Sequence, residues 1–129
     1  MAYSIGEFAA MIGVPASTLR YYEKEGLITP RRDANLVREY EDGDIGWTRF
    51  ILHLKGAGMS VEELKAYTQW REEGDGTIPQ RLGLLEKRRG LVEAEIRKLQ
   101  QSLDLLDRKI EFYHEKPNNP ELVFAYPHP

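Results

Sequence analysis

The 129-residue sequence contains no cysteine, which excludes disulfide bonds, thiolate metal sites and thiol catalysis. It also lacks a long apolar run, and its N-terminus has no basic segment followed by an apolar stretch. We therefore expect neither a membrane span nor a secretory signal, and we expect a cytoplasmic protein. A chain of this length can bury one modest core, alone or with a long appendage, but not two full domains.

A large excess of one charge is missing as well. The chain has 18 Lys and Arg against 21 Asp and Glu, and 41% of its residues are hydrophobic. These values exclude the disordered class, and they do not describe a simple polycation for nucleic acid. The basic side chains are nevertheless concentrated in residues 17–38, where five Lys or Arg face three Asp or Glu.

Catalytic and metal-binding motifs are also lacking. The three histidines, His53, His114 and His128, are scattered, and no H-x-x-x-H, glycine-rich phosphate loop or G-x-S-x-G occurs. A metal site needs more converging ligands than these histidines offer. We therefore expect no enzymatic activity, no cofactor and no bound metal.

Two capping boxes mark helix starts within residues 1–72. In a capping box, a serine and the glutamate three positions later close free amides of the first helical turn. The two pairs are Ser4 with Glu7 and Ser60 with Glu63. Helices are therefore expected over residues 5–12 and 61–70.

Two further helices and a hairpin complete this region. A second helix is predicted over residues 16–25, and its tight connection to the first is typical of a helix-turn-helix. Residues 36–40 are expected to pair with residues near Thr29 as a two-stranded wing. A third helix is predicted over residues 42–57. Its inward-facing side chains are expected to be Trp47, Phe50, Ile51 and Leu54.

After a linker at residues 73–79, the apolar period changes. Residues 80–114 predict one long helix with a heptad pattern, in which apolar residues alternate in steps of four and three. The heptad seam consists of Val92, Ile96, Leu99, Leu103, Leu106, Ile110 and Tyr113. Its simplest partner is the same helix of a second copy, which predicts a homodimer. The alternative is a single helix that packs on its own domain.

The tail, residues 115–129, is expected to be extended because it contains four prolines and has no period. Its apolar side chains predict docking onto the partner subunit or the other domain, with chance exposure as the alternative. They are Leu122, Val123, Phe124 and Tyr126. The domain plan is thus residues 1–72, a linker, a dimerisation helix and this tail.

The segment TLRYYEKEGLI, residues 18–28, lies on the second helix of the predicted helix-turn-helix. In such motifs the second helix enters the major groove of DNA. Leu19 and Tyr22 are expected to face the core. The candidate DNA contacts on this helix are Ser17, Thr18, Arg20, Tyr21 and Lys24, whose polar groups suit phosphates and base edges. The alternative is an ordinary solvated helix face.

Four motifs together resemble the MerR family of bacterial transcription regulators. In order and spacing, YSIGEFAAMIGV, TLRYYEKEGLI-x-P-x-R, VREYEDGDI and FILHLK-x-x-GMS-x-EEL align with that family over residues 3–114. The resemblance implies a mainly α fold, with a winged helix-turn-helix domain followed by a long helix that forms an antiparallel coiled-coil dimer. It also implies binding to double-stranded promoter DNA, whose distortion aligns the promoter elements for RNA polymerase.

The resemblance adds candidate DNA contacts outside the recognition helix. The first wing contributes Arg31, Arg32, Arg38 and Tyr40. A second wing-like element contributes Lys55 and Ser60, with Arg49 as a further candidate.

The sequence departs from the family at three positions. Pro15 stands where a serine often precedes the recognition helix, and Leu36–Val37 replaces a common glycine-tyrosine before the wing arginine. The long helix is most similar to the short-tailed branch that responds to aldehydes and related electrophiles. That branch commonly has a cysteine where this chain has His53, so sensing through a thiol cannot operate here.

Sensing without a thiol leaves several alternatives. His53 is a candidate sensor through protonation, although a lone histidine on a helix is more often simply packed or solvated. A pocket for a small hydrophobic effector is a second hypothesis, against ordinary packing. Its candidate residues are Trp47, Tyr67, Trp70 and Tyr113. DNA binding without an effector is a third. A coiled-coil adaptor whose helix-turn-helix binds a protein is the alternative outside DNA binding.

Overall fold

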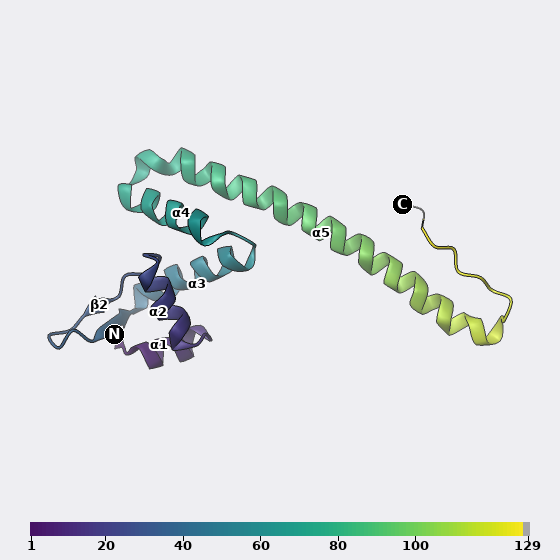
Figure 1. Ribbon diagram of the computed structural model, residues 1–129, viewed down its shortest axis with the longest axis horizontal. Helices are drawn as coiled ribbons and strands as arrows, with labels where there is room; N and C mark the ends of the chain where they lie inside the picture. The colour runs from purple at the N-terminus through teal and green to yellow at the C-terminus, as the bar shows by residue number, and fades with distance from the viewer. Residues whose placement is uncertain (128–129) are drawn as a thin grey trace. The chain divides into compact units, whose positions relative to one another are not determined.

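The computed structural model describes residues 1–127 and is mainly helical (Figure 1). Its elements in chain order are β1 (Ala2–Tyr3), α1 (Ile5–Ile12), α2 (Ala16–Lys24), β2 (Arg31–Arg32), β3 (Arg38–Glu41), α3 (Asp42–Gly56), α4 (Val61–Glu73), η1 (Asp75–Thr77), α5 (Ile78–Glu115) and η2 (Lys116–Asn118). The chain forms two compact units, an N-terminal unit, Met1–Arg88, and a C-terminal unit that begins at Arg89. Within residues 1–127, no helix has the length and apolar character that crossing a membrane requires.

Both predicted capping boxes are present. The amide of Glu7 donates to Ser4 Oγ at 3.2 Å, and the amide of Ser4 donates to Glu7 Oε1 at 3.0 Å. The same reciprocal pair joins Ser60 and Glu63 at 3.1 Å in both directions. The helix after Ser60 runs to Glu73, one turn farther than predicted, because its last turn continues to the glycine at position 74.

The core of the N-terminal unit lies between α1, α2, α3, α4 and the small sheet. Phe8, Leu19, Ile51 and Leu64 are fully buried, each contributed by a different helix. Because each helix supplies at least one buried apolar side chain, the core fixes how α1 and α2 present their outer faces. Phe50 was expected inside, but its side chain is 36% exposed and lies at the edge of this core.

The sheet has three strands in the order β1–β3–β2, all antiparallel. β2 and β3 pair through Arg31↔Glu39 and Arg32↔Arg38, which confirms a hairpin in this region. Its strands are shorter than predicted, because Leu36 and Val37 lie in the loop and Thr29 is outside the sheet. β1 pairs through Ala2↔Glu41 and was not predicted. A strand of two residues is too short to show the alternation from which strands are recognised.

The N-terminal unit extends past the predicted boundary at residue 72. Leu84 and Leu85, in the first turns of α5, pack against the core. Arg88 donates to Glu63 Oε1 at 3.1 Å, which ties the same part of α5 to the start of α4. The start of the long helix therefore belongs to the folded N-terminal unit rather than to a free linker.

In the C-terminal unit, the apolar heptad residues of α5 from Ile96 to Tyr113 are exposed, with Leu103 at 49%. The tail packs on a neighbouring face of the same helix. Lys109 Nζ donates to the Tyr126 hydroxyl at 2.9 Å and lies 4.2 Å from the ring centre of Phe124. Apart from η2 the tail has no regular structure as far as residue 127, and residues 128–129, which include His128, lie outside the described residues. The tail thus contacts its own helix and leaves the heptad residues uncovered within this unit.

Glu63 makes the stability of the N-terminal unit sensitive to acid. Backbone and hydroxyl hydrogen bonds from Ser60, together with the Arg88 charge, hold the pKa of Glu63 below its ordinary value of 4.5. Its contribution is therefore complete above that value and is lost as the pH falls through the lowered pKa. We expect Glu63→Gln to be less stable than wild type at pH 7 by less than about 1 kcal/mol, and to approach the stability of wild type once the pH falls below the lowered pKa of Glu63.

Urea unfolding followed by tryptophan fluorescence measures this difference, since both tryptophans lie in the N-terminal unit. Glu72→Gln, on the exposed side of the same helix, is the matched control. A pH-independent difference between Glu63→Gln and wild type would contradict the assignment.

Candidate nucleic-acid interface

The outer face of α2 presents most of the predicted recognition residues to solvent. Leu19 and Tyr22 are buried as predicted, so the opposite side of the helix must face outward. The exposed side chains on that side are Ser17, Arg20, Tyr21 and Lys24, with Thr18 half-buried beside them. Their spacing of three and four residues aligns them along one stripe of the helix.

The start of α2 is set without a side-chain cap. Pro15 occupies the N-cap position with an extended backbone, and its carbonyl accepts from the amide of Thr18 at 3.0 Å. Gly13 ends α1 with φ 85, a left-handed conformation that glycine adopts without strain. The turn between the two helices is therefore three residues long, as a helix-turn-helix requires.

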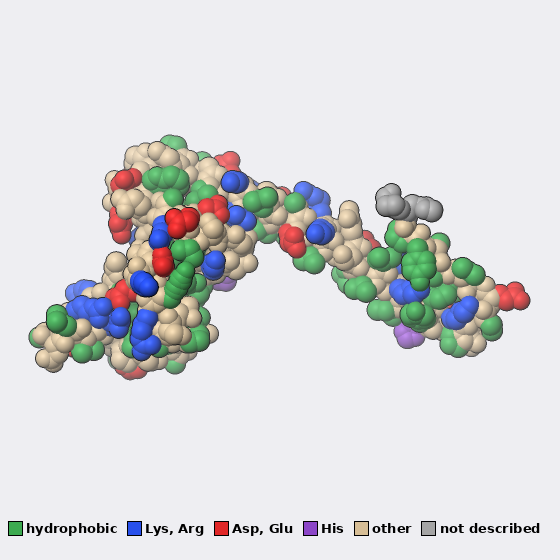
Figure 2. Space-filling view, in the orientation of Figure 1, with side chains coloured by type: hydrophobic (Ala, Val, Ile, Leu, Met, Phe, Trp, Pro, Cys, Tyr) green, Lys and Arg blue, Asp and Glu red, His purple; other side chains and the backbone are tan. Residues whose placement is uncertain are grey.

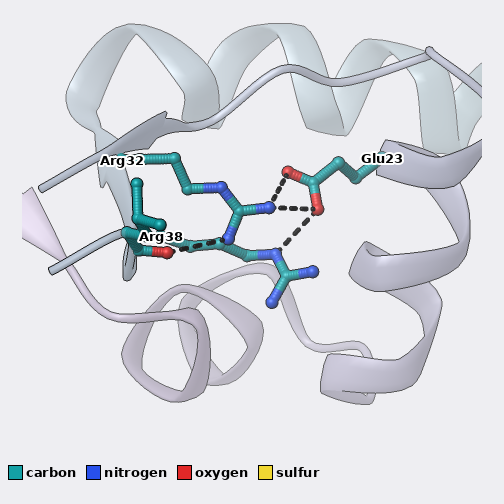
Figure 3. A network of polar contacts seen from close by, with 4 residues as sticks. Glu23, Arg32 and Arg38 are labelled. Atoms are coloured by element: carbon teal, nitrogen blue, oxygen red, sulfur yellow. Dashed lines mark hydrogen bonds and ion pairs between the residues drawn. The ribbon is translucent and has the colours of Figure 1, made fainter.

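Glu23 connects the recognition helix to the wing. It lies on α2, and Arg38 Nε donates to its Oε1 at 2.8 Å, while Arg32 Nη2 donates to both carboxylate oxygens at 3.1 Å (Figure 3). Arg32 Nη1 also donates to the carbonyl of Leu36 at 3.4 Å. The carboxylate thus holds two arginines of neighbouring strands and fixes the hairpin against α2.

This network changes the interpretation of the wing arginines. Arg38 and Arg32 are not free cations, since each is paired with Glu23. Arg31 points elsewhere and pairs with Glu41 at 2.5 Å, and it is largely exposed. Sequence reasoning missed Glu23 because a glutamate in a basic segment gives no signal of its partners, which lie nine and fifteen residues away.

Substitution of Glu23 tests its positioning role. We expect Glu23→Gln to lower the free energy of unfolding by about 1–2 kcal/mol, because two charged hydrogen-bonding partners lose the carboxylate. Glu39→Gln, with the same charge change on β3, is the control. Urea unfolding compares the two variants, and equal stabilities would show that the network contributes nothing.

Tyr40 does not contribute to the interface, contrary to the prediction. Its side chain is 1% exposed and its ring stacks on Phe8, with ring centres 4.3 Å apart. On β3 the side chains alternate between the two faces of the sheet, and Tyr40 falls on the inner face. Desolvation by burial raises the pKa of its hydroxyl. Tyr40 therefore belongs to the core.

The remaining predicted DNA contacts lie on α3 and at the turn before α4. Arg49 and Lys55 are exposed on α3, and Arg49 donates to the carbonyl of Met11 at 3.4 Å. Ser60 is exposed, but its hydroxyl oxygen already accepts the amide of Glu63. In Figure 2, Lys and Arg side chains gather on the face of the N-terminal unit that carries the wing hairpin.

The structure brings together only part of the predicted effector site. Trp47 and Tyr67 stack at 6.3 Å between ring centres, and the guanidinium of Arg71 lies 4.2 Å from the ring centre of Trp47. The adjacent cavity, about 140 Å³, has mainly polar walls that include Asp44, Arg71 and Glu72. In this part of the chain the rings of Trp47 and Tyr67 thus pack against each other, and the guanidinium of Arg71 covers the Trp47 ring.

The other candidates for sensing are dispersed. His53 is exposed on α3. Trp70 is half-buried, and its carbonyl accepts a hydrogen bond from the hydroxyl of Thr77. Tyr113 belongs to the C-terminal unit, where it lies beside Phe112, with ring centres 5.7 Å apart. The effector site stays a prediction.

Comparison with known proteins agrees with this geometry. A model of the MerR helix-turn-helix family of regulatory proteins matches residues 3–75, and a MerR DNA-binding model matches residues 48–109. The chain belongs to the MerR family. It is accordingly a DNA-binding transcriptional regulator with a helix-turn-helix and a long C-terminal helix, as the sequence predicted. Proteins of this family are regulators rather than enzymes.

Relatives match this MerR-family chain over nearly its whole length. An uncharacterized HTH-type transcriptional regulator of Haemophilus influenzae is 38% identical over 116 residues, which cover 89% of this chain and 86% of the relative. A similar solved structure is the crystal structure of HiNmlR, a MerR family regulator that lacks the sensor domain and is bound to promoter DNA. It matches this chain with a TM-score of 0.83 and 36% sequence identity, and the match covers 93% of this chain and 96% of the HiNmlR chain. A MerR family regulator of Listeria monocytogenes has a TM-score of 0.84 at 37% identity and 92% coverage of both chains.

Proposed function

We propose that this MerR-family regulator acts as a homodimer that binds promoter DNA and distorts it, which controls access of RNA polymerase to the promoter. The main support is the exposed stripe of α2 together with a wing that Glu23 holds against it. Each subunit then offers one recognition helix for one half-site, and a two-fold dimer matches a palindromic operator. Binding of this kind would place the protein in the cytoplasm.

The dimer part of the proposal rests on α5. Its heptad residues are exposed over at least three turns, and a helix with an unpaired apolar stripe is stabilised by a second helix. Two copies paired in antiparallel orientation would bury these residues against each other. Any effector that this regulator responds to must act without a thiol, because the chain has no cysteine.

Selection of duplexes from a random-sequence library tests the proposed function directly. We expect the protein to enrich a palindromic site, to shift it as a dimer and to bend it in a circular-permutation mobility assay. Affinity for a phosphate-contacting dimer should fall steeply with salt, by about 0.9 in log–log slope per phosphate contact. Failure to enrich any sequence over random duplex would refute DNA recognition and favour a protein partner for the helix-turn-helix.

A further inference from the structure

Arg88 of α5 reaches across to the turn between α3 and α4. Its Nη2 donates to Glu63 Oε1 at 3.1 Å, and the Arg88 side chain is only 17% exposed. The same carboxylate oxygen accepts the amide of Ser60 at 3.1 Å. One oxygen atom of Glu63 thus joins the long helix to the backbone of the turn.

The guanidinium also lies directly against the backbone of this turn, residues 57–60. Gly58 has φ 98, and a Cβ atom added there would lie 3.1 Å from Arg88 Nη1. Met59, the next residue, is buried in the core. The turn, next to the candidate DNA contacts Lys55 and Ser60, is therefore held by a buried side chain of its own and by a side chain of α5.

Arg88 makes the contact with the N-terminal unit that lies farthest from the corner where α5 begins. Nearer the corner, Arg81 donates to the Gly74 carbonyl at 3.0 Å, and Leu85 packs on the core. Arg88 is the last residue of the N-terminal unit and lies about 15 Å along the helix from Ile78. A contact at this distance from the corner opposes tilting of the helix more effectively than a contact beside it.

The guanidinium of Arg88 is not fully satisfied where it lies. Its Nε is buried and makes no hydrogen bond within residues 1–127. A buried donor without a partner lowers stability, and replacing a buried ion pair by apolar side chains of similar shape is often neutral or stabilising. Stability alone therefore does not favour an arginine over a methionine at this position.

A small tilt at this contact is enlarged along α5. The helix continues from Arg88 to Glu115, a length of about 40 Å at the usual rise of an α-helix. A tilt of about 5° displaces a point at that distance by roughly 3.5 Å, close to the rise of one base pair of DNA. In a dimer paired through α5, the direction in which each helix leaves its N-terminal unit sets the separation of the two recognition helices.

We propose that Arg88, acting through Glu63, is a positioning residue that selects the spacing between the two half-sites of the operator. This inference rests on the proposed function, because it assumes a dimer that binds two half-sites of promoter DNA. With the contact in place, α5 leaves each N-terminal unit in one direction, and only one spacing lets both recognition helices bind. Without it the direction varies, and neighbouring spacings are bound almost as well.

Replacement of Arg88 by methionine removes the guanidinium and keeps a long unbranched side chain. The wild type should prefer its selected duplex over duplexes with one base pair added or removed between the half-sites. We expect Arg88→Met to reduce this preference by at least about fivefold, and to bind an isolated half-site within about twofold of wild type. Fluorescence anisotropy measures all four affinities. Arg97→Met, which changes an exposed arginine of α5 off the heptad seam, is the control and should keep the wild-type preference.

Glu63→Gln removes the same contact from its other end. Glutamine also suits the third position of a capping box, so the start of α4 is retained while the ion pair with Arg88 is lost. We expect the same loss of spacing preference, and the double variant should lose no more than either single variant. Tryptophan fluorescence shows that each variant is folded under the assay conditions. Additive losses would show that the two residues act separately, which would overturn the proposal.

The absence of cysteine allows the same question to be asked without DNA. A spin label on Ala10→Cys, at an exposed position of α1, is attached to the only thiol of each subunit. Pulsed electron–electron double resonance then measures the distances between the two labels of a dimer. We expect these distances to spread over a wider range in Arg88→Met than in wild type or Arg97→Met. Identical distributions would show that Arg88 does not fix the direction of α5, and the inference would fail.

The outcomes separate this inference from the proposed function. If the wild type selects no duplex with two half-sites, the proposed function fails and the inference fails with it. If the wild type selects such a duplex and Arg88→Met keeps the full spacing preference, only the inference fails. Equal losses of half-site and full-site affinity in Arg88→Met would assign Arg88 to DNA contact or to the fold, which also overturns the inference.

Discussion

Replacement of Arg20 by alanine is expected to remove sequence-specific DNA binding while leaving the fold intact. Arg20 is exposed at the centre of the outer stripe of α2, and its side chain makes no hydrogen bond or ion pair within residues 1–127. A bidentate arginine–guanine contact discriminates by about 1–3 kcal/mol, and a dimer makes the contact twice. We therefore expect affinity for the selected duplex to fall by about 10²–10⁴-fold.

The ratio of specific to non-specific affinity identifies the kind of contact that Arg20 makes. If Arg20 reads a base, binding to random duplex should fall far less than binding to the selected duplex. If it contacts only phosphate, both affinities should fall together. Arg97→Ala, which removes an exposed arginine from α5 in the C-terminal unit, is the control and should bind as wild type does. An unaltered ratio in Arg20→Ala would remove this residue from base recognition.

Introduction of a charge at Leu103 is expected to separate the proposed dimer into monomers. Leu103 lies in the middle of the heptad seam and is exposed in the single chain. Leu103→Glu loses apolar burial worth about 1.5–3 kcal/mol in each of two subunits and places two carboxylates in the interface. The dissociation constant of the dimer should rise by at least about 10²-fold.

Sedimentation at micromolar concentration measures this change. Gln101→Glu adds the same charge to the same helix, two residues away and off the seam, and should leave the assembly unchanged. Tryptophan fluorescence reports separately that the N-terminal unit stays folded, because Trp47 and Trp70 both lie there. A wild-type chain that sediments as a monomer, or a Leu103→Glu variant that still sediments as a dimer, would refute pairing through this seam.

A monomeric Leu103→Glu variant also tests whether recognition of the full palindrome requires the dimer. One helix-turn-helix offers contacts to one half-site only, so affinity for the full palindrome should fall toward that for a half-site. Non-specific binding should weaken less, since it depends on phosphates rather than on two half-sites in register.

Local features of the structure were predictable from the sequence because neighbouring residues generate them. The reciprocal capping pairs at Ser4 and Ser60, the buried Leu19 and Tyr22, and the exposed heptad stripe all follow from spacings within one helix. Such spacings determine which side chains share a face, whatever the rest of the chain does. The absence of a thiol was also predictable from the sequence, because no fold can supply one to a chain without cysteine.

Only the tertiary structure decided which polar and aromatic groups of the wing reach the surface. Tyr40 became part of the core because β3 pairs with β1 and lies against Phe8, a contact between residues 32 positions apart in sequence. Arg32 and Arg38 became partners of Glu23 rather than free cations because the hairpin folds back onto α2. These outcomes depend on contacts between distant residues, whose side chains meet only after the whole unit has packed. The sequence therefore determined the exposed stripe of α2 that we propose to meet DNA, and packing determined which side chains of the wing stay at the surface.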